Sequence, residues 1–496
     1  MTMLRAEWTK LRSATGWLAG LIGAAAVILG LGVLAAFGVT TSCGEQEGAD
    51  CPHPPTGPSG QAVNDHFSFV HQPLTGDGTI TAHVADFTGI ITYPPPDHDQ
   101  IVEGLVPWAK AGLIVKDGTK PGSAYASVLV TGAHGTRMQH NFTEDHSGPA
   151  AARWLRLSRS GETIRGYASA DAVDWTEIQS VRLPGLPQTV QIGLFVASPS
   201  NVTAKAGAHG GSIVQARFTQ ATAVFDQVSA TGSWTYDNVG DEPAMQTDWE
   251  QFHQAEGFTT ADGRLTVTGT GDIAPAGQEG GPTITFTLAG LIAALLIVIV
   301  VAVLFITAEY RRGLIRTTLA AMPHRGRVLT AKAAVIGAAV FVAGLVATAV
   351  TLPLAGHVLR ARGNFLLPVP TGTLLRIIVG SAVLLALTAV LAYAIGAVLR
   401  RGVPAVALAI LAVIVPYLLA TTSVLPTTAA QWLMRVTPAA AFAVQQALPA
   451  YPQVGKPYTP TDGYFPLPPW AGLLVLAAWA AAILAFAVIR TRRADA

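Results

Sequence analysis

The chain has 496 residues, of which 50% are hydrophobic and 12% are charged. This charged fraction is about half that of an average soluble domain, so the composition excludes a wholly soluble or disordered protein. The net charge of +1 hides a division, because residues 40–282 carry 26 acidic and 12 basic residues whereas the rest of the chain carries 4 acidic and 19 basic residues. An acidic block inside a basic, apolar frame argues against a nucleic-acid partner, which would require a basic soluble face.

Six uncharged apolar segments are each long enough for a helix to cross roughly 30 Å of hydrocarbon. They are residues 15–39, 283–308, 333–359, 377–399, 402–422 and 469–489. Because a backbone in lipid must satisfy its own hydrogen bonds, we expect six transmembrane helices. The first apolar run is longer than the core of a typical secretion signal, so we expect a retained span, with a secretion signal as the alternative.

Basic residues are distributed unevenly between the connecting segments. Segments 1–14, 309–332, 400–401 and 490–496 contain 14 Lys and Arg residues, against five in the two short loops on the other side. The positive-inside rule therefore predicts a multi-pass protein of the plasma membrane, with both termini cytoplasmic and residues 40–282 extracytoplasmic. Cys43 and Cys51 would then lie in an oxidising compartment, where their spacing favours a small disulfide over two free thiols.

The large outer block has the sequence pattern of a β-protein. Residues 78–86 and 153–159 alternate apolar and polar side chains, and Gly- and Asp-containing turns separate such runs. We expect about ten short strands between residues 64 and 228, folded as a β-sandwich or jelly roll. Residues 229–282 are rich in Gly and Asp, so we expect them to form a tether with short strands near 265–268. The predicted fold class is a six-span α-helical membrane protein with a large all-β domain between spans one and two.

The connection between the second and third expected spans, residues 309–332, is the most informative segment. Its distinctive residues are Glu309, Tyr310, Arg311, Arg312, Gly313, Arg316, Thr317, Pro323, Arg325 and Lys332. Topology alone explains the basic residues, but it does not explain an acid at the mouth of a membrane helix. Pro323 prevents a single continuous helix through the segment.

These residues resemble the signature of exporter-type (type two) ABC transporter permeases. Residues 1–14 likewise resemble the interfacial elbow helix that precedes the first span of those permeases. The resemblance covers residues 1–39 and 283–496, and it departs from the family pattern at Leu314, where the family more often has Thr. It implies that 309–332 is a coupling loop that docks on a separate ATP-hydrolysing subunit. The alternative is a solvated basic loop that only sets the topology.

The resemblance also implies the remaining organisation. A second permease copy would complete the transport pathway, and residues 423–468 would carry short re-entrant helices, with an interfacial loop as the alternative. The sequence contains no G-x-x-x-x-G-K-[ST] run, so no phosphate-binding loop is encoded. ATP and Mg²⁺ are therefore expected in the partner subunit, and this chain is expected to be non-catalytic and without a cofactor of its own.

Residues 64–228 also resemble concanavalin A-like lectin and glucanase sandwiches, through the runs around Trp108, Trp154 and Trp175. In the turn before Trp175, Ala172 stands where those domains usually have Gly. The three tryptophans are candidates for stacking on a glycan of the cell envelope, although we expect positions in the domain core instead. His134, His140 and His146 lie six residues apart, which is not a metal-ligand spacing, so we expect no metal site. No paired carboxylates indicate a glycosidase.

The sequence therefore favours the permease subunit of an ABC transporter, an exporter in direction, powered by a separate ATPase. The alternative is a membrane-anchored carbohydrate-binding or sensing protein that transports nothing. Six spans and a signature-bearing loop exceed what an anchor requires. A membrane enzyme is disfavoured because the chain offers no catalytic constellation.

Overall fold

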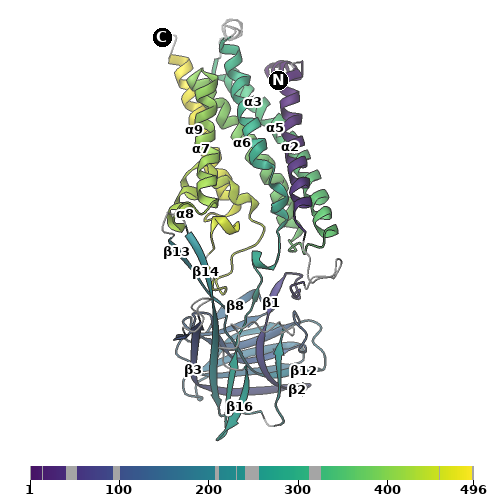
Figure 1. Ribbon diagram of the computed structural model, residues 1–496, viewed down its shortest axis with the longest axis vertical. Coiled ribbons are helices and arrows are strands. Elements are labelled where there is room, and N and C mark those ends of the chain that lie inside the picture. Colours follow the sequence, from purple (N-terminus) through teal and green to yellow (C-terminus); the bar gives the residue numbers. More distant parts are fainter. Residues whose placement is uncertain are drawn as a thin grey trace.

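The computed structural model describes residues 2–13, 15–40, 53–92, 101–206, 212–230, 232–240, 256–311, 325–456 and 458–493. A helical bundle and a β-domain are joined end to end (Figure 1). Both chain termini lie at the end of the bundle that is far from the β-domain. We call this the termini end of the bundle and the opposite one the sandwich end.

Six helices in the described part of the chain are long and apolar enough to cross a membrane. They are α2 (Thr15–Gly38), α3 (Leu291–Arg311), α5 (Arg325–Ala361), α6 (Thr371–Leu399), α7 (Gly402–Thr421) and α9 (Pro469–Arg493). The β-domain is inserted between the first two of them. The predicted fold class is therefore confirmed.

Helix α6 is the centre of the bundle, because it packs against α5, α3 and α9. Helix α5 is longer than the expected span, since it begins at Arg325 within the segment expected to be a loop, and it contains Pro353. Its side chains at Val342, Val346 and Val350 are exposed at a spacing of four residues. Such an apolar stripe is what a helix presents to lipid.

The segment between α7 and α9 contains short helices that do not cross the bundle. These are α8 (Thr427–Val436) and the 3₁₀ helix η4 (Pro438–Gln445). Residues 438–444 are all buried, against α9 and α6. Gly472 permits this packing, because a Cβ there would lie 2.0 Å from the carbonyl oxygen of Ala440. A segment that does not span the membrane as one helix is tolerated within it only when it is buried in protein, and η4 meets that condition.

The β-domain is a sandwich of two antiparallel sheets. The seven-stranded sheet has the order β15 (Thr235–Val239), β2 (Phe67–Thr75), β12 (Thr189–Ala197), β5 (Lys110–Lys116), β6 (Tyr125–Thr131), β7 (Thr136–His140), β8 (Glu144–Ser147). The nine-stranded sheet has the path β11 (Thr176–Arg182), β10 (Thr163–Ser169), β9 (Trp154–Ser160), β3 (Gly78–Thr92), β14 (Ser212–Asp226), β17 (Arg264–Gly269), β16 (Gly257–Ala261), with β13 (Asn201–Ala206) on β14 and β4 (Ile101–Glu103) on β3. Leu155 and Leu157 of β9 alternate into the core between the sheets, as the period-two pattern predicts.

The expectation that residues 229–282 form a tether is wrong. Strand β15 pairs with β2, β17 pairs with β14, and β18 (Ile273–Pro275) pairs with β1 (Val63–Asp65). Among the described residues, Gly240, Asp262, Gly263 and Gly271 lie at turns beside these strands, with positive φ values. Local composition did not reveal the strands' assembly, because their partners lie much earlier in the chain.

The sandwich joins the bundle through loops that contact one another. The Asn364 side-chain amide donates to the Val39 carbonyl at 2.9 Å, and the Leu367 amide donates to the Pro282 carbonyl at 3.1 Å. Both ends of the insertion are therefore held by the loop between α5 and α6. Closer to α9, the Gln453 side chain donates to the Thr143 carbonyl at 2.9 Å, in the turn between β7 and β8.

Candidate functional site

Three helices meet at the termini end, around the ends of the segment 312–324. Helix α3 stops at Arg311, helix α5 starts at Arg325, and α1 (Thr2–Ser13) packs beside α5. Glu309 lies in the last turn of α3, and Lys332 lies about two turns into α5. The helix ends therefore place an acid and a base on either side of the segment expected to couple to a partner.

Glu7 of helix α1 joins Glu309 and Lys332 in one cluster of charged side chains. Lys332 is fully buried, and its Nζ lies 2.7 Å from Glu7 Oε2 and 2.7 Å from Glu309 Oε1. Lys10 lies at the rim, half-exposed, with its Nζ 3.4 Å from the same Glu309 oxygen and 4.0 Å from Glu7 Oε1. We call Glu7, Lys10, Glu309 and Lys332 the elbow cluster. Its two carboxylates and two ammonium groups balance, which is how a protein tolerates buried charge.

The surroundings of the elbow cluster are apolar. The Phe305 ring centroid lies 5.7 Å from Lys332 Nζ, and Trp17 packs edge-on against Phe305 at 5.7 Å between centroids. Glu309 Oε2 is buried and has no hydrogen-bond partner among the described residues. In such a setting each ionic contact is strong and the loss of one partner is expensive.

The elbow cluster ties three helices into one unit. A displacement of the segment 312–324 acts on α3 and α5 at once, because that segment joins them. Separating Glu309 from Lys332 would leave buried charges unpaired in a low dielectric, so these contacts resist separation of α1, α3 and α5.

The other residues expected in the coupling loop are placed unevenly. Tyr310 is half-buried, with the Arg400 guanidinium 5.4 Å from its ring centroid, and Arg311 is exposed. Arg325 is the first residue of α5. Arg312, Gly313, Arg316, Thr317 and Pro323 lie outside the described residues, as do Cys43 and Cys51.

Sequence reasoning singled out Glu309 and Lys332 but did not join them to Glu7 or Lys10. A signal existed, because acidic residues are scarce outside 40–282. The four there are Glu7, Glu309, Asp462 and Asp495. Glu7 and Glu309 both contact Lys332, the one lysine in helix α5. A lysine buried there without acidic partners would be unfavourable.

Comparison with known proteins identifies the family. The family model described as "ABC-2 family transporter protein" matches residues 140–496. The chain belongs to the ABC-2 transporter family. No curated protein sequence matches it. Among solved structures, a functionally unknown protein from Saccharomyces cerevisiae is similar at 14% identity, over 38% of this chain and 83% of that one, but with a TM-score of 0.17 the likeness carries no argument.

Membership makes this ABC-2 protein a membrane component of an ABC transporter. The matched region contains Glu309 and Lys332 together with five of the six candidate spans. It begins within β7, so Glu7 and α1 lie outside it. The elbow cluster therefore joins the matched region to the start of the chain.

The three tryptophans, candidates for glycan stacking that we expected in the domain core, are not brought together, and of the three only Trp108 is buried. Trp108 is buried and stacks on His134 at 4.1 Å between ring centroids, with the Arg137 guanidinium 5.4 Å from its ring. Arg137 lies on the outer face of the seven-stranded sheet, because its neighbour Met138 points into the core. Trp108 is thus engaged on that face.

Trp154 and Trp175 are half-buried on the other side of the sandwich. Trp154 stacks on His83 at 4.8 Å, and the Arg156 guanidinium lies 3.7 Å from the Trp175 ring centroid. Trp154 and Arg156 flank the inward-pointing Leu155, which places them on the outer face of the nine-stranded sheet. Each tryptophan therefore has its own protein partner, and the three form no common platform.

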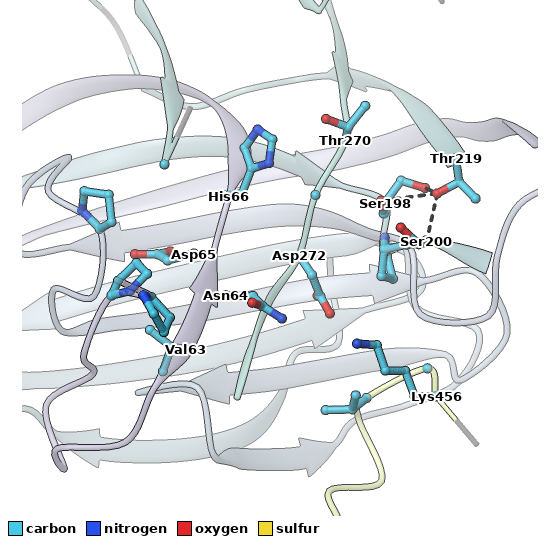
Figure 2. Close-up of a pocket in the computed structure, with 18 of the residues that line it drawn as sticks. Val63, Asn64, Asp65, His66, Ser198, Ser200, Thr219, Thr270, Asp272 and Lys456 are labelled. Atoms are coloured by element: carbon cyan, nitrogen blue, oxygen red, sulfur yellow. Dashed lines mark hydrogen bonds between the residues drawn. The ribbon is translucent and has the colours of Figure 1, made fainter. Parts of the chain in front are cut away.

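A cavity of about 860 Å³ lies where the sandwich meets the membrane domain (Figure 2). Its polar lining includes Asn64, Asp65, His66, Ser198, Thr219, Asp272 and Lys456. Ser198 and Thr219 hydrogen-bond to each other at 2.7 Å, and Asp272 pairs with Lys110 at 2.6 Å. The carboxylates of this wall are thus already engaged in holding the sandwich together.

Proposed function

We propose that this ABC-2 protein is the permease subunit of an ABC exporter whose ATPase is a separate chain. The termini end of the bundle faces the cytoplasm, and the sandwich stands outside the membrane. The basic residues that gather at the termini end support this orientation. The exporter direction and a second permease copy rest on the likeness of residues 309–332 to exporter-type permeases.

One observation carries the coupling role. Lys332 lies buried between Glu7 and Glu309. Glu309 precedes the segment 312–324 in the chain, and Lys332 follows it. An ATPase that docks on this segment and closes on Mg²⁺-ATP moves α3 and α5 together, and the elbow cluster passes that movement to α1. Through such a joint, nucleotide binding in the ATPase and substrate binding in the membrane pathway could each shift the position of the same three helices.

Two further proposals concern the outer domain. Its pair of antiparallel sheets supports a concanavalin A-like fold, and an extracytoplasmic position supports a Cys43–Cys51 disulfide. A function as an anchored carbohydrate-binding protein is disfavoured, because the chain belongs to a transporter family and its tryptophans form no platform.

The coupling role is tested by co-purifying the chain with a candidate ATPase encoded beside it and measuring ATP hydrolysis in lipid nanodiscs. Glu7→Gln leaves Lys332 paired with Glu309, so the complex should remain intact. We expect the permease-dependent part of the hydrolysis rate to fall by about tenfold, as coupling energies are roughly 1–3 kcal/mol.

Arg12→Met is the matched control, because Arg12 is exposed on the same helix α1. Its hydrolysis rate should stay within about twofold of the unsubstituted complex, as for surface changes of roughly 0.5 kcal/mol. An unchanged rate in Glu7→Gln, or failure of the chain to bind any such ATPase, would refute the coupling role.

A further inference from the structure

The hairpin of β7 and β8 brings together three side chains that the sequence keeps apart. His140 lies opposite Glu144, and Met138 lies opposite His146, so both histidines and Glu144 share one face of the hairpin. Their ligand atoms all lie within 4.8 Å of one another. The rings of His140 and His146 stack at 5.9 Å between centroids.

This arrangement corrects the expectation that histidines six residues apart lack metal-ligand spacing. That rule applies to an extended strand or a single helix, whereas here the chain reverses between the two histidines. Asn141 and Phe142 make the reversal, with φ values of 47° and 72° in the left-handed region. The turn thereby folds His146 back beside His140.

We propose that His140, Glu144 and His146 bind a divalent transition-metal ion of the zinc class. Two imidazoles and one carboxylate are a ligand set that zinc takes, with water as a fourth ligand. A tetrahedral ion with bonds of about 2.0–2.1 Å holds its donors about 3.4 Å apart. The donor atoms, which lie within 4.8 Å of one another, would need to approach by at most about 1.4 Å to reach that spacing.

The state of His140 suits a ligand. Its Nδ1 is buried and has no hydrogen-bond partner among the described residues. This nitrogen is therefore free to serve as a metal ligand, since imidazole nitrogens are ligands that zinc takes.

Asp145 and His134, the nearby residues that could also bind a metal, are engaged elsewhere, so the proposed site consists of three residues. Asp145 lies on the opposite face of the hairpin, where Arg137 and the Gln139 side chain, at 2.9 Å, hold its carboxylate. His134 stacks on Trp108 instead. Imidazole ligands favour zinc-class ions over Ca²⁺ or Mg²⁺, which prefer sets made of oxygen alone.

The site lies beside a contact between the two domains. Gln453 of the membrane domain holds the carbonyl of Thr143, one residue before Glu144. A bound ion would thus fasten β7 to β8 at the point where the sandwich meets the loop that leads to α9.

The test uses the full chain, purified in detergent without a histidine tag and stripped with EDTA, and titrated with Zn²⁺ by calorimetry. We expect one equivalent to bind. His140→Ala, His146→Ala and Glu144→Gln should each raise the Kd for Zn²⁺ at least about tenfold. Even the loss of an outer-shell partner lowers metal affinity by about 10–100-fold. His134→Ala is the matched control and should bind like the unsubstituted chain.

Glu144→Gln keeps the size and shape of an exposed side chain, so it decides the matter if a histidine variant fails to fold. Unchanged Zn²⁺ affinity in Glu144→Gln and in either histidine variant would overturn the proposal. Weak binding that His134→Ala reduces as much as His140→Ala would mean surface coordination and would overturn it equally. In EDTA, the elution volume of each variant verifies its fold.

Discussion

The sandwich and the helical bundle both bury lysines, but they neutralise them differently. In the sandwich, Lys116 meets Asp65 at 2.7 Å and Lys110 meets Asp272 at 2.6 Å, and both lysines are fully buried. Each pair fastens the small β1–β18 sheet, or the residue just before it, to strand β5. Burial raises the pKa of Asp65 in spite of the attraction of Lys116, so desolvation outweighs the pairing.

In the bundle, one buried lysine serves two acids. Lys332 contacts Glu7 and Glu309, and Lys10 supplies the second positive charge from the rim. Each pair in the sandwich joins two sheets whose strands are already held by their own backbone hydrogen bonds, whereas the shared lysine joins three separate helices. The difference suggests a static clamp in the sandwich and a joint in the bundle.

The largest change to the molecule is the removal of the whole sandwich, and it tests whether the bundle folds without it. Replacing residues 41–280 by eight Gly and Ser residues should leave the bundle folded, because the loop holding Asn364 and Leu367 binds both ends of the insertion. Such a linker spans about 15 Å. A monodisperse elution profile and the helical signal in circular dichroism are the measurements.

Removing only residues 64–228 should instead cause aggregation. That deletion leaves β15 and β18 without partners and removes β14 from one side of β17, which exposes their edges. If the complete replacement also aggregated, the two regions would not be independent and the comparison would fail.

The next effect compares the two kinds of buried lysine. Lys116→Met and Lys332→Met should each cost about 3–5 kcal/mol, because each leaves buried carboxylate charge uncompensated. Adding Asp65→Asn should recover most of the loss in the sandwich. In the bundle, Glu7→Gln and Glu309→Gln should each recover part of the loss, because Lys10 remains to balance one carboxylate. Apparent melting temperatures in detergent provide the measurement.

Arg327→Met serves as the control for Lys332→Met, since Arg327 is exposed on the same helix. It should change stability by no more than about 0.5 kcal/mol. Full recovery of Lys332→Met by Glu309→Gln alone would show that Glu7 is not an equal partner, and the shared-lysine description would be wrong.

The smallest effect concerns the turn before Trp175. Ala172 has φ of 66°, a left-handed conformation that costs an L-residue about 1–2 kcal/mol. The Ser169 hydroxyl accepts the Ala172 amide at 3.0 Å, and Asp171 Oδ1 accepts the amides of Val173 and Asp174 at 2.9 and 3.0 Å. These bonds hold the turn in place although Gly is missing.

Ala172→Gly should therefore stabilise the sandwich by about 1 kcal/mol and leave the bundle unchanged. The tryptophan fluorescence of the full chain during thermal unfolding measures the shift. Val173→Gly is the control, because this exposed neighbour is not in the left-handed region and should gain nothing. Because added Gly raises the entropy of the unfolded chain, equal stabilisation by both substitutions would show that the gain does not come from the left-handed conformation of Ala172.

Sequence reasoning succeeded where the signal was local. Hydropathy over some twenty residues predicted the six helices, and period-two alternation around residues such as Leu155 and Leu157 predicted the sandwich. It failed where distant segments meet, as in the pairing of β15 with β2. No local period reveals which of two far strands will lie side by side.

The sites show the same division. Glu309 stood out as an acid beside a membrane span, but its connection to Glu7 depends on how α1 folds back against α5. His140 and His146 were read along a straight chain, whereas the turn at Asn141 places them together. In both cases the residues were visible in the sequence and their neighbours were not.

Pro353 gives helix α5 a point of bending at the end of a long, uninterrupted stretch. Pro353 lacks an amide hydrogen, so the backbone bond to residue 349 is absent and bending concentrates there. Between Lys332 and that point α5 is continuous for roughly 30 Å, at about 1.5 Å per residue. Under the proposed coupling role, a displacement at the elbow cluster would be carried along this stiff part of α5, and the helix would bend at Pro353, close to the sandwich.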